Sequence, residues 1–96
     1  MLPIVQSSQS EQDLIALWLY IAADNPTAAT RLLERIDRRI ESLAQYPLLG
    51  EHQPEFGENT RRIIEGNYLV FYDALPDAVH VLRVFHGIRK IENLFG

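Results

Sequence analysis

Two stretches of the chain repeat apolar residues at steps of three and four, the spacing that places side chains on one face of an α-helix. The first stretch contains Leu14, Leu17, Trp18 and Ile21, and the second contains Ala29, Leu32, Leu33, Ile36, Ile40 and Leu43. Between them stands Asp24-Asn25-Pro26. Proline disfavours helical backbone in the residue before it and suits the first turn of a new helix. The pattern therefore predicts an antiparallel hairpin of two helices, over about 10–23 and 26–46.

The start of the first helix is predicted at Ser10. A serine hydroxyl is a good acceptor for the free amides of a first helical turn. Asp13 follows three residues later, and Glu11 adds a second carboxylate near the positive end of the helix dipole. Ser10 and Asp13 are therefore expected to act together as a helix cap.

The rest of the chain follows the pattern of strands and turns. Residues 2–6 form a short apolar run with Pro3 near its start, which favours an edge strand. Residues 51–60 are polar and predict a loop. Gly66-Asn67 is a typical two-residue hairpin turn. Further strands are predicted at 61–65, 68–75 and 78–85, so the expected order is β-α-α-β-β-β in an α+β fold.

The middle strand of the last three is apolar on both faces. Strict alternation places Tyr68, Val70 and Tyr72 on one side, and Leu69 and Phe71 on the other. A helix hairpin can cover only one face of a sheet, so the sequence predicts that something else covers the second face.

Length and composition limit the function. The 96 residues are expected to form one domain over 1–96, with a C-terminal tail at 88–96. A net charge of −4 argues against a partner that is mainly phosphate backbone, and no sequence-specific nucleic-acid binding is expected. The chain contains no cysteine, which fits a reducing cytoplasm. We expect neither a membrane span nor a signal peptide.

Candidate chemistry is sparse. Arg61, Arg62 and Arg83 could bind phosphate or carboxylate groups, or could pair with the chain's own acids. His86 could act as a general acid or base, or could simply close a strand end. His80 and His86 are expected on one side of a strand, about 20 Å apart, which is too far to share a metal ion. No cofactor is expected.

Aromatic residues leave two readings open, because Tyr68 and Tyr72 could stack bases or pack in the core. The sequence contains no glycine-rich phosphate loop and no Ser-His-Asp order. Site chemistry alone therefore does not identify an enzyme.

Several short segments resemble the ParE branch of the RelE/ParE toxin superfamily, and the resemblance covers almost the whole chain. The most specific segments are Tyr20-Ile21-Ala22, Asn25-Pro26, Ala28-Ala29, Tyr46-Pro47, Gly50, Gly66-Asn67-Tyr68 and Arg83-Val84-Phe85-His86-Gly87. The resemblance implies an antiparallel two-helix hairpin packed on a mainly antiparallel sheet. It also implies the toxin of a type II toxin–antitoxin system, as in plasmid stabilisation.

A ParE-like toxin is expected to inhibit DNA gyrase and to form a hetero-oligomer with an antitoxin whose C-terminal segment wraps it. The alternative is a RelE-like ribosome-dependent mRNA endonuclease, for which Arg62, Arg83 and His86 are the candidate catalytic residues. For a gyrase inhibitor no catalytic residue is expected. A non-toxic homologue that only binds antitoxin, or an interaction module unrelated to toxicity, is a further possibility.

The antitoxin is expected on the second sheet face or on the hairpin surface, and the tail is expected to meet gyrase. The residues expected to contact partners are Arg31, Arg35, Arg61, Tyr72, Arg83, Ile88, Arg89, Ile91, Leu94 and Phe95.

Overall fold

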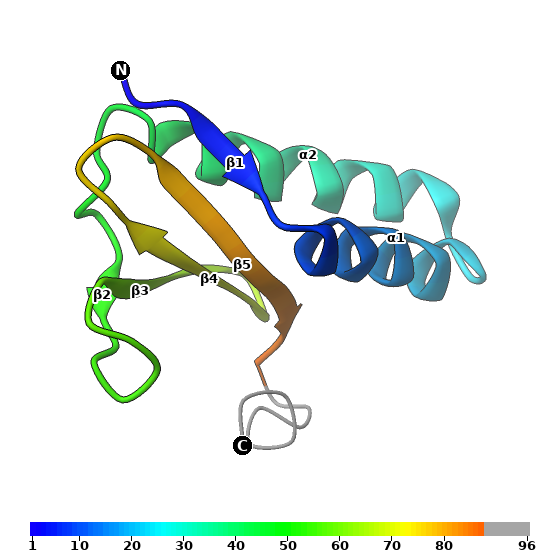
Figure 1. The fold of residues 1–96 in the computed structure, drawn as a ribbon. Coiled ribbons are helices and arrows are strands. Elements are labelled where there is room, and N and C mark those ends of the chain that lie inside the picture. Colours follow the sequence, from blue (N-terminus) through cyan, green and yellow to red (C-terminus); the bar gives the residue numbers. More distant parts are fainter. Residues whose placement is uncertain (88–96) are drawn as a thin grey trace.

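The computed structural model describes residues 1–87, which form a helix hairpin and a five-stranded sheet (Figure 1). The elements are β1 (Ile4–Gln6), α1 (Ser8–Ala22), α2 (Pro26–Ser42), β2 (Glu51–His52), β3 (Thr60–Glu65), β4 (Tyr68–Ala74) and β5 (Val79–His86). The strand order is β1-β5-β4-β3-β2, with β1 parallel to β5 and every other pair antiparallel. The predicted α+β fold and its edge strand at the N-terminus are confirmed.

The junction between the helices forms as its sequence predicts. Asn25 caps α2 by accepting a hydrogen bond from the amide of Ala28 at 3.1 Å, and Pro26 occupies the first turn. The predicted cap of α1 is wrong, because Ser7 holds that position and accepts from the amide of Ser10 at 3.0 Å. Ser10 is fully buried instead, and its hydroxyl donates to Gln6 at 2.7 Å. The second helix ends at Ser42, earlier than predicted.

The β3–β4 hairpin turns at Gly66-Asn67, with Gly66 at a φ of 59°, as the sequence predicts. The stretch predicted as a loop at 51–60 also contains β2, whose Glu51 and His52 pair with β3. Two paired residues are too few for the alternation that reveals a strand.

A β-bulge shifts the register between β4 and β5. Phe71 lies opposite Arg83, but Tyr72 lies opposite Val81, so Leu82 has no opposite residue on β4. Val81 and Val84 are consequently both buried in the core, although strict alternation would separate them. The same bulge places His80 and His86 on opposite faces, which corrects the prediction that they share one side.

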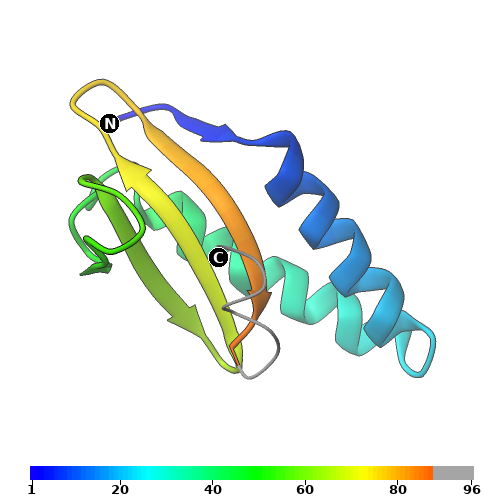
Figure 2. The ribbon, with the colours of Figure 1, turned by 60° about the horizontal axis from the view of Figure 1, so that its bottom comes forward.

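The helices cover one face of the sheet and one edge. Figure 2 shows α2 behind the sheet and α1 beside β5. The core between α2 and the sheet centres on residues such as Ile36, Val70 and Tyr72. On the other face Phe71 is also fully buried, and its ring meets Phe56 edge-on, with 5.3 Å between centroids. The second face is therefore partly covered by the chain's own loop between β2 and β3. No helix within residues 1–87 is long and apolar enough to cross a membrane.

Candidate functional site

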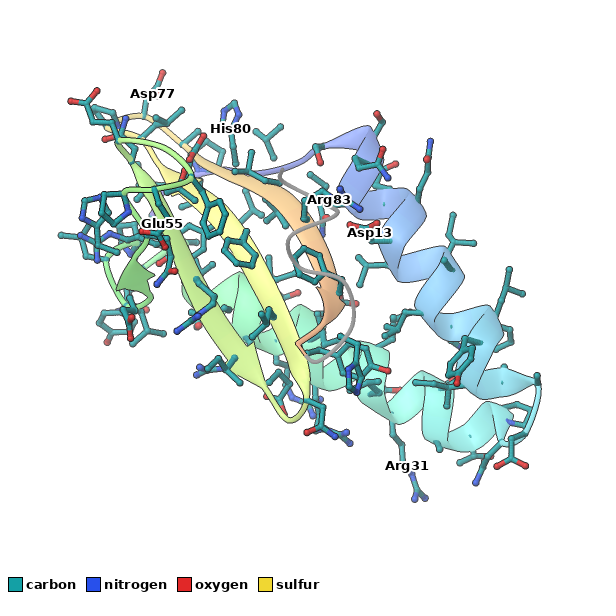
Figure 3. The ribbon with its side chains drawn as sticks, turned by 90° about the horizontal axis from the view of Figure 1, so that it is seen from below. Asp13, Arg31, Glu55, Asp77, His80 and Arg83 are labelled. Atoms are coloured by element: carbon teal, nitrogen blue, oxygen red, sulfur yellow. The ribbon has the colours of Figure 1, made fainter. Side chains whose placement is uncertain are left out.

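Arg83, a candidate for catalysis and for partner binding, forms an ion pair with Asp13 of α1. Its Nε lies 2.8 Å from Oδ2 of Asp13 and its Nη2 lies 3.1 Å from Oδ1. The two side chains point toward one another from β5 and α1 (Figure 3). They are 18% and 12% exposed, respectively. Such a two-point contact fixes both groups, so the guanidinium of Arg83 is committed inside the fold.

The same contact protects the edge of the sheet. Strand β1 ends at Gln6, and β5 continues past it without a neighbouring strand. The hydroxyl of Ser7 donates to the carbonyl of Leu82 at 2.9 Å, and Asp13 accepts from the amide of Val84 at 2.9 Å. Helix α1 thus replaces a strand at this edge, which would otherwise offer free backbone groups to another chain.

The structure does not bring together the three candidate nuclease residues. Arg62 and Arg83 lie opposite Phe71 from the two sides, so they share the second sheet face at about 10 Å, which is two strand spacings. Arg62 is 3.6 Å from Glu51, and its Nε is buried without a hydrogen-bond partner among the described residues. His86 is opposite Tyr68, so strand alternation places it on the helix face.

Arg61 and Tyr72 connect the sheet to the segment that follows α2. Arg61 donates to the carbonyl of Gly50 at 2.8 Å, and the Tyr72 hydroxyl donates to the carbonyl of Pro47 at 2.7 Å. The amide of Gly50 donates in turn to the Tyr72 hydroxyl at 2.9 Å. Burial is the main cause that raises the pKa of Tyr72 above 10.0. Tyr72 is 0% exposed, so the expected contact with a partner meets a core residue.

The basic side of α2 is accessible. Arg31 projects away from the molecule (Figure 3). Arg35 and Arg39 lie 3.6 and 3.9 Å from Glu65 at the end of β3, but their side chains remain 49% and 40% exposed. Arg31 and Arg35 are thus available to a partner. The expected tail contacts Ile88, Arg89, Ile91, Leu94 and Phe95 lie outside the described residues.

The sequence reading missed the exposed apolar side of α1. Ile15, Leu19 and Tyr20 are 61%, 60% and 67% exposed. The signal was present, because no charged residue stands between Asp13 and Asp24. A helix that is apolar on every side requires a second cover beyond its own core.

A second group of exposed apolar side chains surrounds the end of α2. It comprises Met1, Tyr46, Leu48 and Leu49. They lie near an open depression of about 340 Å³ that is lined by Met1, Leu2, Ala44, Gln45 and Pro47. Within residues 1–87, no group of three or more histidines and carboxylates is placed to hold a metal ion. The accessible features of the described chain are therefore surfaces suited to binding.

The sequence model of the family described as "ParE toxin of type II toxin-antitoxin system, parDE" matches residues 4–91. Toxin RelE1 of Caulobacter vibrioides is 28% identical over 91 residues, covering 91% of this chain and 95% of the relative. Toxin RelE2 of the same organism is 30% identical over 91 residues, covering 93% and 99%.

A solved structure has the same fold. It is titled "Chromosomal ParDE TA system from P. aeruginosa" and superposes with a TM-score of 0.74 at 18% identity, covering 90% of this chain and 96% of the other. At that identity the likeness concerns the fold alone. The match of the family model over residues 4–91 decides the family: this chain belongs to the ParE toxins of type II toxin–antitoxin systems.

Proposed function

We propose that this chain is a toxin that inhibits DNA gyrase in the cytoplasm and is neutralised in a hetero-oligomer with its cognate antitoxin. Membership of the ParE family supports the toxin and the antitoxin partner. The gyrase target follows from the resemblance to the ParE branch. The observation that favours it over RNA cleavage is the ion pair between Asp13 and Arg83, because a guanidinium held at two points is not available to an RNA phosphate.

The arrangement of the other candidate groups supports the same choice. General acid–base catalysis requires the donor and acceptor groups to converge within hydrogen-bond reach of one reacting centre. Arg62 lies on the second sheet face and His86 on the helix face, with β4 between their strands. A substrate phosphate on one face could not meet both groups.

Ribosome-dependent mRNA cleavage is the second candidate. Two observations favour it: the curated relatives include proteins named Toxin RelE, and Nε of Arg62 is buried without a partner in the described chain. Arg62 is thus the one candidate group with hydrogen-bonding capacity to spare.

A comparison of two assays separates these mechanisms. Purified toxin added to gyrase and relaxed plasmid is expected to block supercoiling and to leave linear DNA, and an equimolar amount of antitoxin is expected to restore the reaction. Full supercoiling with a toxin preparation that arrests growth would overturn the gyrase target.

Primer extension after induction provides the second readout. We expect no new 5′ ends inside translated messages, and we expect Arg62→Gln and His86→Gln variants to arrest growth as the parent does. New ends that disappear in both variants would establish the nuclease mechanism instead. A chain that binds antitoxin without arresting growth would be a non-toxic homologue.

A further inference from the structure

Two contacts fix how α2 is turned about its axis. On one flank the indole nitrogen of Trp18 in α1 donates to the hydroxyl of Thr30 at 3.2 Å. On the other flank Arg35 and Arg39 approach Glu65 of β3. One side of α2 therefore faces α1 and the opposite side faces the sheet edge at β3.

The charges of α2 are separated between these flanks. Helical spacing places Glu34, Asp37 and Glu41 on the flank of Thr30, because they follow it by four, seven and eleven residues. Arg31 belongs to the other flank, since Arg35 and Arg39 follow it at four-residue steps. The side of α2 next to α1 is consequently acidic, although the helix as a whole is rich in arginine.

The acidic flank lies beside the exposed apolar residues of α1. Ile15 is one turn before Trp18, and Leu19 follows Ile15 by four residues, so both continue the surface that Trp18 and Thr30 join. We call this surface the acidic–apolar face and define it by Ile15, Leu19, Glu34, Asp37 and Glu41. Ile15 and Leu19 are 61% and 60% exposed, and all three acidic residues are exposed.

The carboxylates of this face have no cation of their own. Within residues 1–87, no arginine, lysine or histidine nitrogen lies within 4.0 Å of Glu34, Asp37 or Glu41. Burial raises the pKa of Asp37, and the negative charge of Glu41 raises it further. A positive group from another molecule would relieve this repulsion.

We propose that the acidic–apolar face binds a segment of the antitoxin that presents aliphatic side chains together with lysine or arginine. Aliphatic groups at helical spacing would cover Ile15 and Leu19, and the cations would meet the carboxylates of α2. The charge argues against a second copy as the occupant, since a symmetric contact would place two acidic faces against each other. This inference rests on the proposed function, because it names the surface that the antitoxin occupies.

Calorimetric titration of the purified toxin with its antitoxin tests the face, using the full chain and matched controls. The Ile15→Ala/Leu19→Ala variant is expected to raise Kd at least tenfold, and so is Asp37→Lys. Leu48→Ala removes an equally exposed apolar side chain elsewhere, and Glu58→Lys makes the same charge change in the loop between β2 and β3. Both controls should stay within twofold of the parent.

Salt dependence isolates the electrostatic part. Raising the salt concentration is expected to weaken binding of the parent more than binding of Asp37→Lys, because the variant has already lost the attraction. Circular dichroism melting confirms that each variant is folded, since all the changed side chains are exposed.

The outcomes separate the two levels of the argument. If the parent arrests growth and binds antitoxin, but the face variants bind as the controls do, the face is overturned while the proposed function stands. If the parent neither arrests growth nor binds antitoxin, both fail. If the free toxin forms dimers that Ile15→Ala/Leu19→Ala dissociates without changing antitoxin affinity, the occupant is a second copy and the inference is overturned.

Discussion

Asp13 satisfies three donors at once: the Nε and Nη2 atoms of Arg83 and the amide of Val84. With 12% of its side chain exposed, it holds the charge of Arg83 and the edge of β5 in a single contact. A largely buried pair contributes little net stability compared with two apolar residues, but breaking it by removing one partner is costly. At this scale the pair ties α1 to the sheet.

The first prediction concerns this pair. Asp13→Leu and Arg83→Met are each expected to lower the free energy of unfolding by about 3 kcal/mol, because each leaves a charge with little solvent and no partner. The double variant is expected to lose clearly less than the sum of the two. Urea unfolding of all four proteins gives the coupling energy, and additive losses would mean that the pair does not act as one unit.

The role of Asp13 also shows where sequence reasoning stops at the residue scale. Its position three residues after Ser10 predicted a helix cap, but its partner lies 70 residues later in the chain. Tyr72 is similar, because strand alternation identified its face but not its bonds to Pro47 and Gly50. Local spacing carries no information on contacts that only the packed fold creates.

Among the elements, the turns and loops depend on glycines for two different reasons. Gly66 has a φ of 59°, and a Cβ there would meet nothing within 4 Å. At Gly50 a Cβ would lie 2.8 Å from the carbonyl oxygen of Arg62 and 2.8 Å from the Tyr72 hydroxyl. The first position therefore needs glycine for its backbone conformation and the second for space.

The second prediction follows from that difference. Gly66→Ala is expected to cost about 1 kcal/mol through backbone strain alone, and Gly66→Asn less, because asparagine tolerates the left-handed region. Gly50→Ala is expected to cost about 2 kcal/mol, because the methyl group would push apart the bonds that Tyr72 makes. Thermal unfolding ranks the three variants, and the smallest loss at Gly50 would contradict this account.

Periodic elements were predictable, and interruptions of a period were not. Both helices, the Asn25-Pro26 junction and the Gly66-Asn67 turn follow from spacing and from local backbone preference. The bulge at Leu82 does not, since one unpaired residue leaves no mark in a strand of mixed apolar residues. It nevertheless determines which histidine faces the helices, so it changes the candidate site as well as the fold.

Across the whole molecule, charge is separated by surface. The chain has a net charge of −4, yet Arg31 and Arg35 gather on one side of α2 while Asp37 and Glu41 gather on the other. The sequence reading named the arginines as partner contacts. It passed over the carboxylates, because their separation becomes visible only once the flanks of α2 are fixed by Trp18 and Glu65.

Asp37 connects this charge distribution to stability. Burial and Glu41 raise its folded-state pKa above 3.8, so the folded protein disfavours the ionised form more than the unfolded chain does. Ionised Asp37 therefore lowers stability at neutral pH. As the pH falls through the folded-state pKa toward 3.8, the native state takes up the proton first and the penalty disappears.

The last prediction is that Asp37→Asn gives a small rise in Tm at pH 7, and that the rise vanishes near pH 3.5. The exposed control Glu58→Gln should show no such pH-dependent gain. Differential scanning calorimetry of the free toxin measures both, and a lower Tm for Asp37→Asn at pH 7 would mean that the carboxylate is favourably paired in the free chain. The same variant should bind antitoxin more weakly, because a group that binding relieves and folding tolerates trades stability for recognition.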